Sequence, residues 1–322
     1  MGFSDFITQT GTEPLIPTEQ SMAIIKTAKE QSLVMRLGRR LPDLSRKTRT
    51  LKVEDQLASV YMVNGPSGAN APGLKQVTTT HWNDVILTAE ELAVIVPIPQ
   101  QMLDDTMVPI WPEVREQIAA AFAQAIDEAA LIGTIGGVAV FATWPTGGVR
   151  AHAVNAGNSV ALGTGADIYD DLLAEAGVFS LVEADGFEVN NCIGLISLKS
   201  RLRGLRDGLG NPILNKVPGT GMGYELDGAS IAFPRNGVLG SATHLIVGDF
   251  DMLCYAMRQD LSYTLATEGV ITDAAGNIIH NLFQQDMVAL RAVMRFGFVL
   301  PNPINQTQPV AASRSPFGVL TT

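Results

Sequence analysis

The pattern of apolar positions is most regular in residues 112–132, PEVREQIAAAFAQAIDEAALI. Apolar side chains recur there at every fourth position, close to the period of an α-helix: Val114, Ile118, Phe122, Ile126 and Ala130. Pro112 suits the first helical position, and Gly133 can end the helix. The pattern predicts a helix about 30 Å long, at about 1.5 Å per residue, with an apolar stripe able to lie along one side of a sheet.

The segment 50–99 instead predicts a long β-hairpin. Its two arms are LASVYMVN at 57–64 and QVTTTHWNDVILTAEELAVIVPIP at 76–99, the second rich in the Thr, Val and Ile that favour strands. Between them, GPSGANAPG at 65–73 carries the glycine and proline that favour a turn. Because a two-stranded ribbon is at best marginally stable alone in water, we expect this hairpin to rest on a neighbouring copy of the chain.

The remaining segments predict shorter helices and strands. Residues 1–17 indicate an extended tail, and Thr18 can cap a helix that runs to about Gly38. A glycine-rich, strand-prone stretch at 134–165 precedes a helix from about Asp167 to Ala184. Further strands are expected at 192–197, 225–234, 243–248, 261–266 and 287–300, with a basic loop at 198–214 and a polar tail after Pro301. Helices and strands mix without regular alternation and without an internal repeat, which indicates an α+β fold.

Composition limits the class of protein. The 322 residues suit one large domain or two interwoven sub-domains. With 46% hydrophobic and 17% charged residues, and a mean hydropathy of +0.19, disorder along the whole chain is excluded. The longest apolar stretch, within 92–99, is far shorter than the roughly 18 residues of a membrane span. The N-terminus lacks the basic start and apolar core of a secretory signal, so we expect folding in a cytoplasm.

Charge and cysteine usage add two expectations. The net charge of −10 argues against a dedicated nucleic-acid binder, yet residues 26–52 form a basic segment with nine Lys or Arg against two acids. That segment is either a solvated face that meets acids on other subunits or a contact with nucleic acid. Cys192 and Cys254 lie on apolar stretches without ligand spacing, so we expect buried thiols and no disulfide.

Signatures of catalysis are nearly absent. GTGMG at 219–223 has Tyr224 in place of a third glycine, and the four histidines are at least 36 residues apart. The pair Asp249 and Asp251, within VGDFDML, is the strongest candidate for a metal site. An apolar stripe at i, i+3, i+4 and i+7 predicts a helix directly after it: Phe250, Leu253, Cys254 and Met257. Asp249 is then a helix cap and Asp251 a first-turn acid, without a metal. A metal-dependent enzyme using both aspartates is the remote alternative.

Several segments, taken in order, carry a resemblance to a known family. They are LIPTEQSMAIIKTAKEQS, LAVIVPIPQQMLDDT, PEVREQIAAAFAQAIDEAALIGT, PTGGV, LRGLRDGLGNPIL, YELDGASIAFP, LIVGDFDML and MVALRAVMRFGFVLPNP. Over nearly its whole length the chain resembles the major capsid proteins of tailed phages with the Hong Kong 97 type fold. Each segment alone is a loose match, and their order and spacing together are specific.

The resemblance implies a wedge-shaped, non-enzymatic subunit without cofactors. Its expected parts are an N-arm at 1–45, a first P-domain part at 46–133 with the spine helix 112–132 and an extension loop (E-loop) at about 52–90, an A-domain at 134–261, P-domain strands at 262–300 and a C-terminal tail at 301–322. Three sets of inter-subunit contacts are implied: the E-loop tip (Asn64, Gly65, Pro66, Gly68, Pro72 and Lys75), the N-arm and basic segment (Arg36, Arg39, Arg40, Arg46 and Lys47) and an axial A-domain loop (Arg201, Arg203 and Arg206).

The implied function is an icosahedral shell of pentamers and hexamers around double-stranded DNA, assembled in the host cytoplasm and found in the virion. Implied partners are copies of the chain, a scaffolding protein, a portal, a decoration protein and DNA contacted non-specifically, with no membrane. Some relatives join subunits through an isopeptide bond between Lys and Asn with a Glu as base. Lys75 and Asn302 or Asn305 could pair, but no Glu follows Glu268, so we expect no such bond. The alternative within the same fold is an encapsulin compartment, which usually begins with a helix rather than seventeen tail-like residues.

Overall fold

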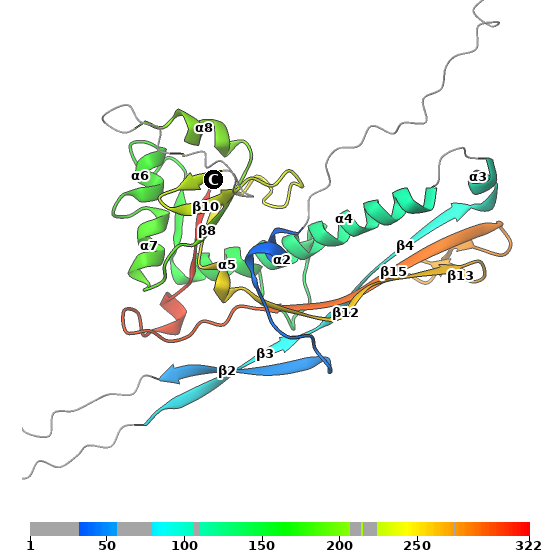
Figure 1. Cartoon of the computed structure of the whole chain (residues 1–322), viewed down its shortest axis with the longest axis horizontal. Coiled ribbons are helices and arrows are strands. Elements are labelled where there is room, and N and C mark those ends of the chain that lie inside the picture. Colours follow the sequence, from blue (N-terminus) through cyan, green and yellow to red (C-terminus); the bar gives the residue numbers. More distant parts are fainter. Residues whose placement is uncertain (1–31, 57–78, 106–109, 207–213, 215–223, 274) are drawn as a thin grey trace, which may run out of the picture.

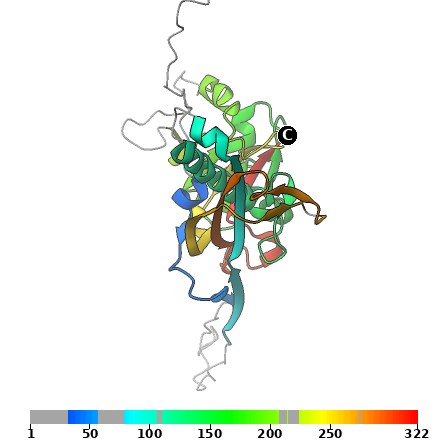
Figure 2. The ribbon, with the colours of Figure 1, turned by 90° about the vertical axis from the view of Figure 1, so that its right-hand side faces the viewer.

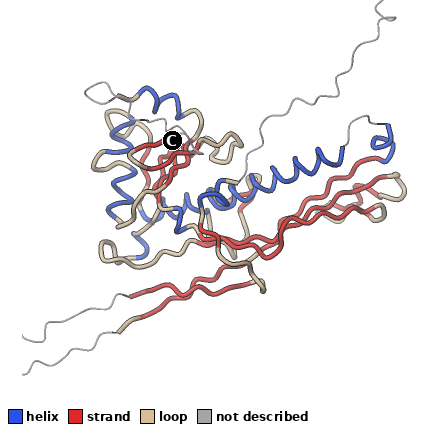
Figure 3. The backbone as a smooth tube through the Cα atoms, in the orientation of Figure 1, coloured by secondary structure: helices blue, strands red, loops and turns tan. Residues whose placement is uncertain are grey.

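Two β-sheets, one long helix and a projecting hairpin make up the computed structural model (Figure 1). It describes residues 32–56, 79–105, 110–206, 214, 224–273 and 275–322. The six-stranded sheet and its helices form one end of the molecule, and the long helix runs from there along the four-stranded sheet to the other end (Figure 3). This mixture of helices and sheets agrees with the expected α+β class.

The long helix is α4, Ile110–Leu131, and it confirms the clearest prediction. It begins two residues before Pro112, which remains in the first turn. Ile118, Phe122 and Ile126 of the predicted stripe are buried, and Gly133 follows the helix with φ +79°. The buried stripe shares one hydrophobic core with side chains of the four-stranded sheet.

The four-stranded sheet supports α4. Its order is β1-β12-β15-β4, with β1 parallel to β12 and the other pairs antiparallel. The strands are β1 Arg39–Arg40, β12 Cys254–Ala266, β15 Met287–Val299 and β4 Glu90–Pro99. At the end far from the six-stranded sheet lie the helix α3, Gln100–Asp105, and a small hairpin of β13, Val270–Thr272, and β14, Ile278–Asn281 (Figure 1).

The six-stranded sheet is buried on both faces. Its order is β7-β16-β11-β8-β10-β9, with strands β7 Ser159–Ala161, β16 Phe317–Thr321, β11 Thr243–Gly248, β8 Asn191–Gly194, β10 Ala229–Ala232 and β9 Glu225–Leu226. Its helices are α5 Gly148–Ala156, α6 Ile168–Leu173, α7 Val178–Ala184 and α8 Leu198–Gly204. Along β16, Val319 belongs to the core shared with α4 and Leu320 to the core shared with α6 to α8. Burial on both faces explains why these strands are continuous apolar runs.

The predicted hairpin is present at its root and differs along its second arm. Strand β2, Thr48–Gln56, pairs with β3, His81–Thr88, and this ribbon projects beyond the body in both views (Figures 1 and 2). The second arm does not run on to residue 99, because the chain leaves the ribbon at Ala89 and β4 joins the four-stranded sheet. The arm predicted at 57–64 lies outside the described residues, as do the tail at 1–17 and the start of the helix from Thr18. Within the described part of the expected helix, a five-residue helix, α2 Leu33–Leu37, begins after its own N-cap, Ser32.

Three local predictions are wrong because tertiary pairing overrides the local pattern. The stripe from Phe250 gives only a 3-10 turn, η2 Phe250–Met252, since Cys254 already pairs with Val299 in a long antiparallel ladder. The stretch 134–165 contains the short hairpin of β5, Thr134–Ile135, and β6, Val138–Ala139, but also helix α5. The single helix from 167 to 184 is two helices, α6 and α7, with Gly177 packed against the end of α6 and too close for a Cβ.

The C-terminal segment also differs from the tail expected after Pro301. Its last residues form β16, a strand inside the six-stranded sheet, so the segment crosses from one sheet to the other. A short helical turn, η3 Ala311–Ser313, precedes it. The buried Arg314 guanidinium donates to the Asn302 side-chain oxygen at 2.9 Å and to the Gln308 carbonyl at 2.7 Å. Strand β12 enters the four-stranded sheet at Cys254, earlier than the strand expected at 261–266.

Candidate functional site: the root of the projecting hairpin

The projecting ribbon joins the body at Ala89, the single residue between β3 and β4. Ala89 is buried, and its N–H donates to the Lys47 carbonyl at 2.8 Å, which ties the two sides of the root together. Because both strands of the ribbon enter through this point, the contacts around Ala89 fix the direction in which the ribbon leaves the molecule.

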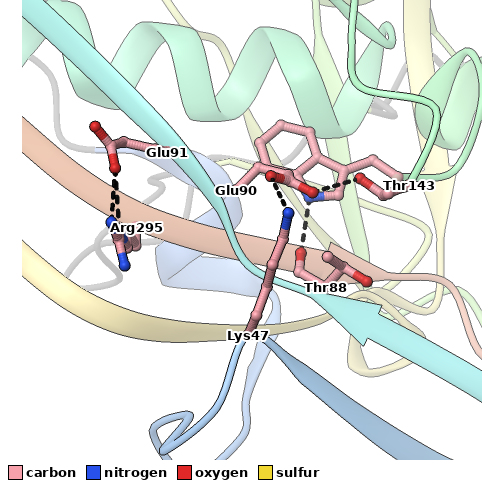
Figure 4. A network of polar contacts seen from close by, with 7 residues as sticks. Lys47, Thr88, Glu90, Glu91, Thr143 and Arg295 are labelled. Atoms are coloured by element: carbon pink, nitrogen blue, oxygen red, sulfur yellow. Dashed lines mark hydrogen bonds and ion pairs between the residues drawn. The ribbon is translucent and has the colours of Figure 1, made fainter.

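An indole ring holds one side of the root. Trp144 lies in the loop between β6 and α5, is buried, and donates from Nε1 to the Thr88 carbonyl at 2.9 Å (Figure 4). Its ring packs against Phe298, with centroids 5.1 Å apart, and edge-on against Phe296 at 6.2 Å. A buried carbonyl without a donor is costly, so this hydrogen bond and the ring packing stabilise one position of Thr88.

A carboxylate holds the other side. Glu90, the first residue of β4, accepts from the Thr143 hydroxyl at Oε1, 3.0 Å away, and pairs through Oε2 with the Lys47 ammonium at 3.0 Å (Figure 4). The Glu90 side chain is 14% exposed, whereas that of Lys47 is 57% exposed. The next residue, Glu91, pairs with Arg295 of β15 at 2.9 Å in a more exposed position. Two adjacent carboxylates therefore serve different ends: Glu90 holds the ribbon root, and Glu91 pairs within the four-stranded sheet.

The root also depends on a close approach between β15 and Ala89. At Gly297 an added Cβ would lie 2.4 Å from the Thr88 carbonyl oxygen and 3.1 Å from the Ala89 Cα. Both contacts are to backbone, which has no flexible side-chain end that can move aside. The strand needs glycine here for space rather than for an unusual backbone conformation.

We expect Gly297→Ala to displace the ribbon root and lower the unfolding temperature by several degrees, in line with about 1–3 kcal/mol for overpacking a core. Differential scanning calorimetry of the purified chain measures this effect. Gly204→Ala is the matched control, because an added Cβ there meets nothing within 4 Å. An unfolding temperature for Gly297→Ala equal to that of the control would contradict the close approach.

The two faces of the ribbon differ in what covers them. On one face Leu87, Leu51 and Val85 pack with the small cluster around Leu44. On the other face Trp82 is 64% exposed and Ile86 is 57% exposed. Lys52 and Asp84 form an ion pair on that second face, between the two apolar residues. An exposed tryptophan and isoleucine on a ribbon are the chemistry of a contact surface rather than of a solvated loop.

The structure places the other expected contact residues as follows. The six E-loop tip residues lie outside the described residues. The basic residues of the N-arm segment are all exposed: Arg36, Arg39, Arg40, Arg46 and Lys47. Arg40 pairs with Asp43 at 3.0 Å, and Lys47 holds the ribbon root, a role that the sequence did not indicate. The basic loop expected at 198–214 is wrong in its first part, because residues 198–204 form helix α8, which buries Leu198 and Leu202 against its neighbours. Arg201 and Arg203 are exposed on α8, and Arg206 is exposed just after it.

Within VGDFDML, Asp249 acts as an N-cap, as the sequence predicted, although the element that it caps is the 3-10 turn η2. Its carboxylate accepts from the Asp251 N–H at 3.0 Å and from the Asn190 side chain at 2.8 Å. Burial raises the pKa of Asp249, against the effect of these hydrogen bonds. Asp251 is exposed, and within the described ranges no group of three or more His, Cys, Asp or Glu is placed to hold a metal ion. Asp249 caps the short turn η2, and Asp251 lies within that turn.

Sequence reasoning missed a buried carboxylate on α4. Asp127 is fully buried and accepts from the Ser32 hydroxyl at 2.5 Å, the Leu33 N–H at 2.9 Å and the Val34 N–H at 3.0 Å. These groups are the first turn of α2, so Asp127 fixes where the N-terminal segment joins the body. Burial raises the pKa of Asp127, while the hydrogen bonds oppose that change. The only signal in the sequence was an acid beside the apolar stripe.

The sequence model of the phage capsid family matches residues 13–304. The chain belongs to the phage capsid family. A relative of this capsid chain, the "Major capsid protein" of Staphylococcus phage 80alpha, is 26% identical over 279 residues, which cover 86% of this chain and 78% of the relative.

Solved structures agree with the family. One from Microbacterium phage Oxtober96 is 31% identical with a TM-score of 0.81, and covers 98% of this chain and 99% of that one. Another, from Mycobacterium phage Adephagia, is 27% identical with a TM-score of 0.77, and covers 98% of each chain. The predicted resemblance to capsid proteins of tailed phages is confirmed.

Membership of this family settles the coarse function. The chain is a structural component of a phage virion and belongs to a family of capsid proteins, not of enzymes. Capsid proteins assemble with copies of themselves into shells. Among the described helices, none combines the length and apolar character needed to cross a membrane.

Proposed function

We propose that the chain is the major head subunit of a tailed phage, with the Hong Kong 97 type fold, and that its pentamers and hexamers form an icosahedral shell around double-stranded DNA. The observation that carries this proposal is the projecting ribbon with an exposed apolar face. In one copy, Trp82 and Ile86 face solvent. In a shell, burying such a face contributes about 25 cal/mol per Å2 of apolar area, and many weak contacts act together.

Each sheet of the fold, and the projecting ribbon, is assigned here to one part of this proposed subunit. The α4 helix with the four-stranded sheet is the P-domain, and its helix is the spine. The six-stranded sheet with α5 to α8, including β16 from the C-terminal segment, is the A-domain, and the β2–β3 ribbon is the root of the E-loop. The small β13–β14 hairpin lies at the far end of the P-domain (Figure 1). This hairpin and the turn after it expose several large apolar side chains, which suits a second contact between copies: Val270, Ile278, Ile279 and Phe283.

The central experiment is assembly of the purified chain, expressed alone and with its genomic neighbours, followed by negative-stain electron microscopy. Closed shells are expected, and Trp82→Glu is expected to reduce their yield at least tenfold while leaving the unfolding temperature unchanged, because this side chain is exposed in the single copy. Ile196→Glu, at an exposed apolar residue beside the six-stranded sheet, controls for a general effect of added charge. A chain that stays monomeric at high concentration in both preparations would overturn the proposal.

The basic N-arm segment is proposed to bridge acidic patches on neighbouring subunits. Neutralising Arg39 and Arg40 to glutamine is expected to reduce assembly, while the backbone pairing of β1 with β12 remains. Shell yield and DNA content are measured together. Intact shells with altered DNA packing would show instead that the segment contacts nucleic acid.

We expect no isopeptide bond between subunits. Both asparagines proposed as partners for Lys75 are already held within the chain: Asn302 donates to the Arg314 carbonyl at 2.8 Å, and Asn305 donates to the Asp185 carbonyl at 2.7 Å. Boiling shells in detergent is therefore expected to release monomers of 34.3 kDa on an electrophoresis gel. A ladder of covalent oligomers is the contrary result.

The other partners of the proposed subunit are a scaffolding protein, a portal, a decoration protein and the packaged DNA. Assembly is proposed to take place in the host cytoplasm. Particles filled with DNA and attached to tails support the phage-head function, whereas an enzyme enclosed as cargo would indicate an encapsulin-type compartment.

A further inference from the structure

The carboxylate of Glu90 joins three segments that are far apart in the sequence. It begins β4, it accepts from Thr143 in the loop before α5, and it pairs with Lys47, the residue before β2. Each of its two oxygens has a different partner (Figure 4). A swing of the ribbon about Ala89 changes at least one of these two distances.

The loop before α5 holds the root at two adjacent points. Thr143 donates to Glu90, and Trp144 donates to Thr88, so the loop reaches both residues that flank Ala89. The same loop leads into α5, which packs against β16 of the six-stranded sheet. The ribbon is continuous in sequence with β4 and lies close to β15 at its root, so the four-stranded sheet holds it directly. The loop before α5 links the same root to the six-stranded sheet.

From this arrangement we propose that Glu90 is a positioning residue that sets the angle of the ribbon relative to the six-stranded sheet and, through that angle, the curvature of the assembled shell. The claim about shell curvature rests on the function proposed above. The claim about the ribbon angle applies to a single free chain and does not depend on assembly.

A small change of angle at the root displaces the far end of the ribbon by a large distance. Strand β2 has nine residues, which span about 30 Å at about 3.3 Å per residue. A rotation of about 10° at the root therefore moves the far end of the described ribbon by about 5 Å. Contacts between packed surfaces are lost over shorter distances than this, so the angle decides where on a neighbour the ribbon lies.

Two adjacent residues give a matched pair of variants. Glu90→Gln keeps the size of the side chain and its acceptor for Thr143, but removes the charge that pairs with Lys47. Glu91→Gln makes the same change one residue later, where the partner is Arg295 of the sheet. The conservative variant Lys47→Arg retains the charge and should behave as the unsubstituted chain.

The angle is measured in the free subunit by double electron–electron resonance between spin labels at Thr50→Cys on the ribbon and Glu183→Cys on α7. Both sites are exposed, whereas Cys192 and Cys254 are buried. Glu90→Gln is expected to broaden the distance distribution at least twofold, with no broadening in Glu91→Gln. Shells of Glu90→Gln, sized by electron microscopy, are expected to be heterogeneous in diameter, and those of Glu91→Gln uniform.

The outcomes separate the two proposals. A distribution for Glu90→Gln as narrow as that of the unsubstituted chain, or equal broadening in both variants, overturns the role of Glu90. A broadened distribution with shells of unchanged diameter overturns the link to curvature. Failure of the unsubstituted chain to form shells counts against the proposed function, while the distances in the free subunit still test Glu90.

Discussion

Replacing Asp127 with alanine is expected to lower the free energy of unfolding by about 3 kcal/mol, because buried donors are left without an acceptor. The donors are the Ser32 hydroxyl and the N–H groups of Leu33 and Val34, all of them buried. The α2 turn is expected to detach first, since these groups are its first turn. Chemical denaturation followed by circular dichroism measures the loss, and hydrogen exchange of residues 33–37 locates it.

Gln117→Ala is the matched control on the same helix. Gln117 is exposed, and its side chain donates to Glu113 on the same helix at 3.2 Å, so its loss is expected to cost less than about 0.5 kcal/mol. Similar losses in Asp127→Ala and Gln117→Ala would contradict the role assigned to the buried carboxylate.

The stability lost in Asp127→Ala is expected to depend on pH, and the pKa of Asp127 gives the direction. Burial raises the pKa of Asp127 in the folded chain above its value in the unfolded chain. The contribution of this group to stability therefore rises as pH falls through the folded pKa, and levels off near the unfolded value of about 3.9. The stability difference between the unsubstituted chain and Asp127→Ala is expected to grow on acidification. Protonation of Asp127 is therefore not expected to detach the α2 turn from α4.

Phe317→Ala is expected to be still more damaging, with a loss of about 3–5 kcal/mol for removing a buried aromatic side chain. Phe317 is fully buried at the start of β16, and its ring packs edge-on against Phe250 with centroids 5.5 Å apart. Because β16 lies between β7 and β11, its disruption affects both neighbouring strands. We expect aggregation on expression at 37 °C, and in the soluble fraction a large fall in the unfolding temperature.

Val310→Ala, in the same C-terminal segment, tests the alternative that the whole segment is a tail. Val310 is 55% exposed, so this substitution is expected to leave stability within about 0.5 kcal/mol. A Phe317→Ala chain as stable as Val310→Ala would show that the terminal strand does not belong to the core.

In one segment the sequence predicted the buried positions correctly but the secondary structure incorrectly. The stripe of Phe250, Leu253, Cys254 and Met257 was predicted as a helix face, and all four side chains are buried. Phe250 and Leu253 belong to the η2 turn and its end and lie in the core beneath α4. Strand β12 is covered on both sides: Cys254 packs in the core beneath the ribbon, and Met257 in the core beneath α4. A strand covered on both faces has no period of two, so its apolar run cannot be told from a helix by periodicity.

In the projecting ribbon, too, the local sequence predicted the strands but not their tertiary arrangement. Strand-favouring residues predicted it, but nothing local marks Ala89 as the point where the chain changes sheets. That change is decided by partners elsewhere: β15 provides the pairing for β4, and the Trp144 indole provides the donor for the Thr88 carbonyl. The exposed residues Trp82 and Ile86 were part of the predicted arm, but which face they occupy followed only from the register with β2.

The sequence by itself determined the long α4 helix, the strand-rich ribbon, most strands of the two sheets, the absence of a catalytic signature and the relationship to phage capsid proteins. These features depend on periodicity, propensity and the order of segments, which neighbouring residues carry. Only the tertiary structure decided that Asp127 meets Ser32, 95 residues away, that Trp144 meets Thr88 across 56 residues, and that the C-terminal residues form an inner strand. The physical reason is that burial and hydrogen bonding are properties of pairs, and the partner in each of these pairs lies beyond the reach of any local pattern.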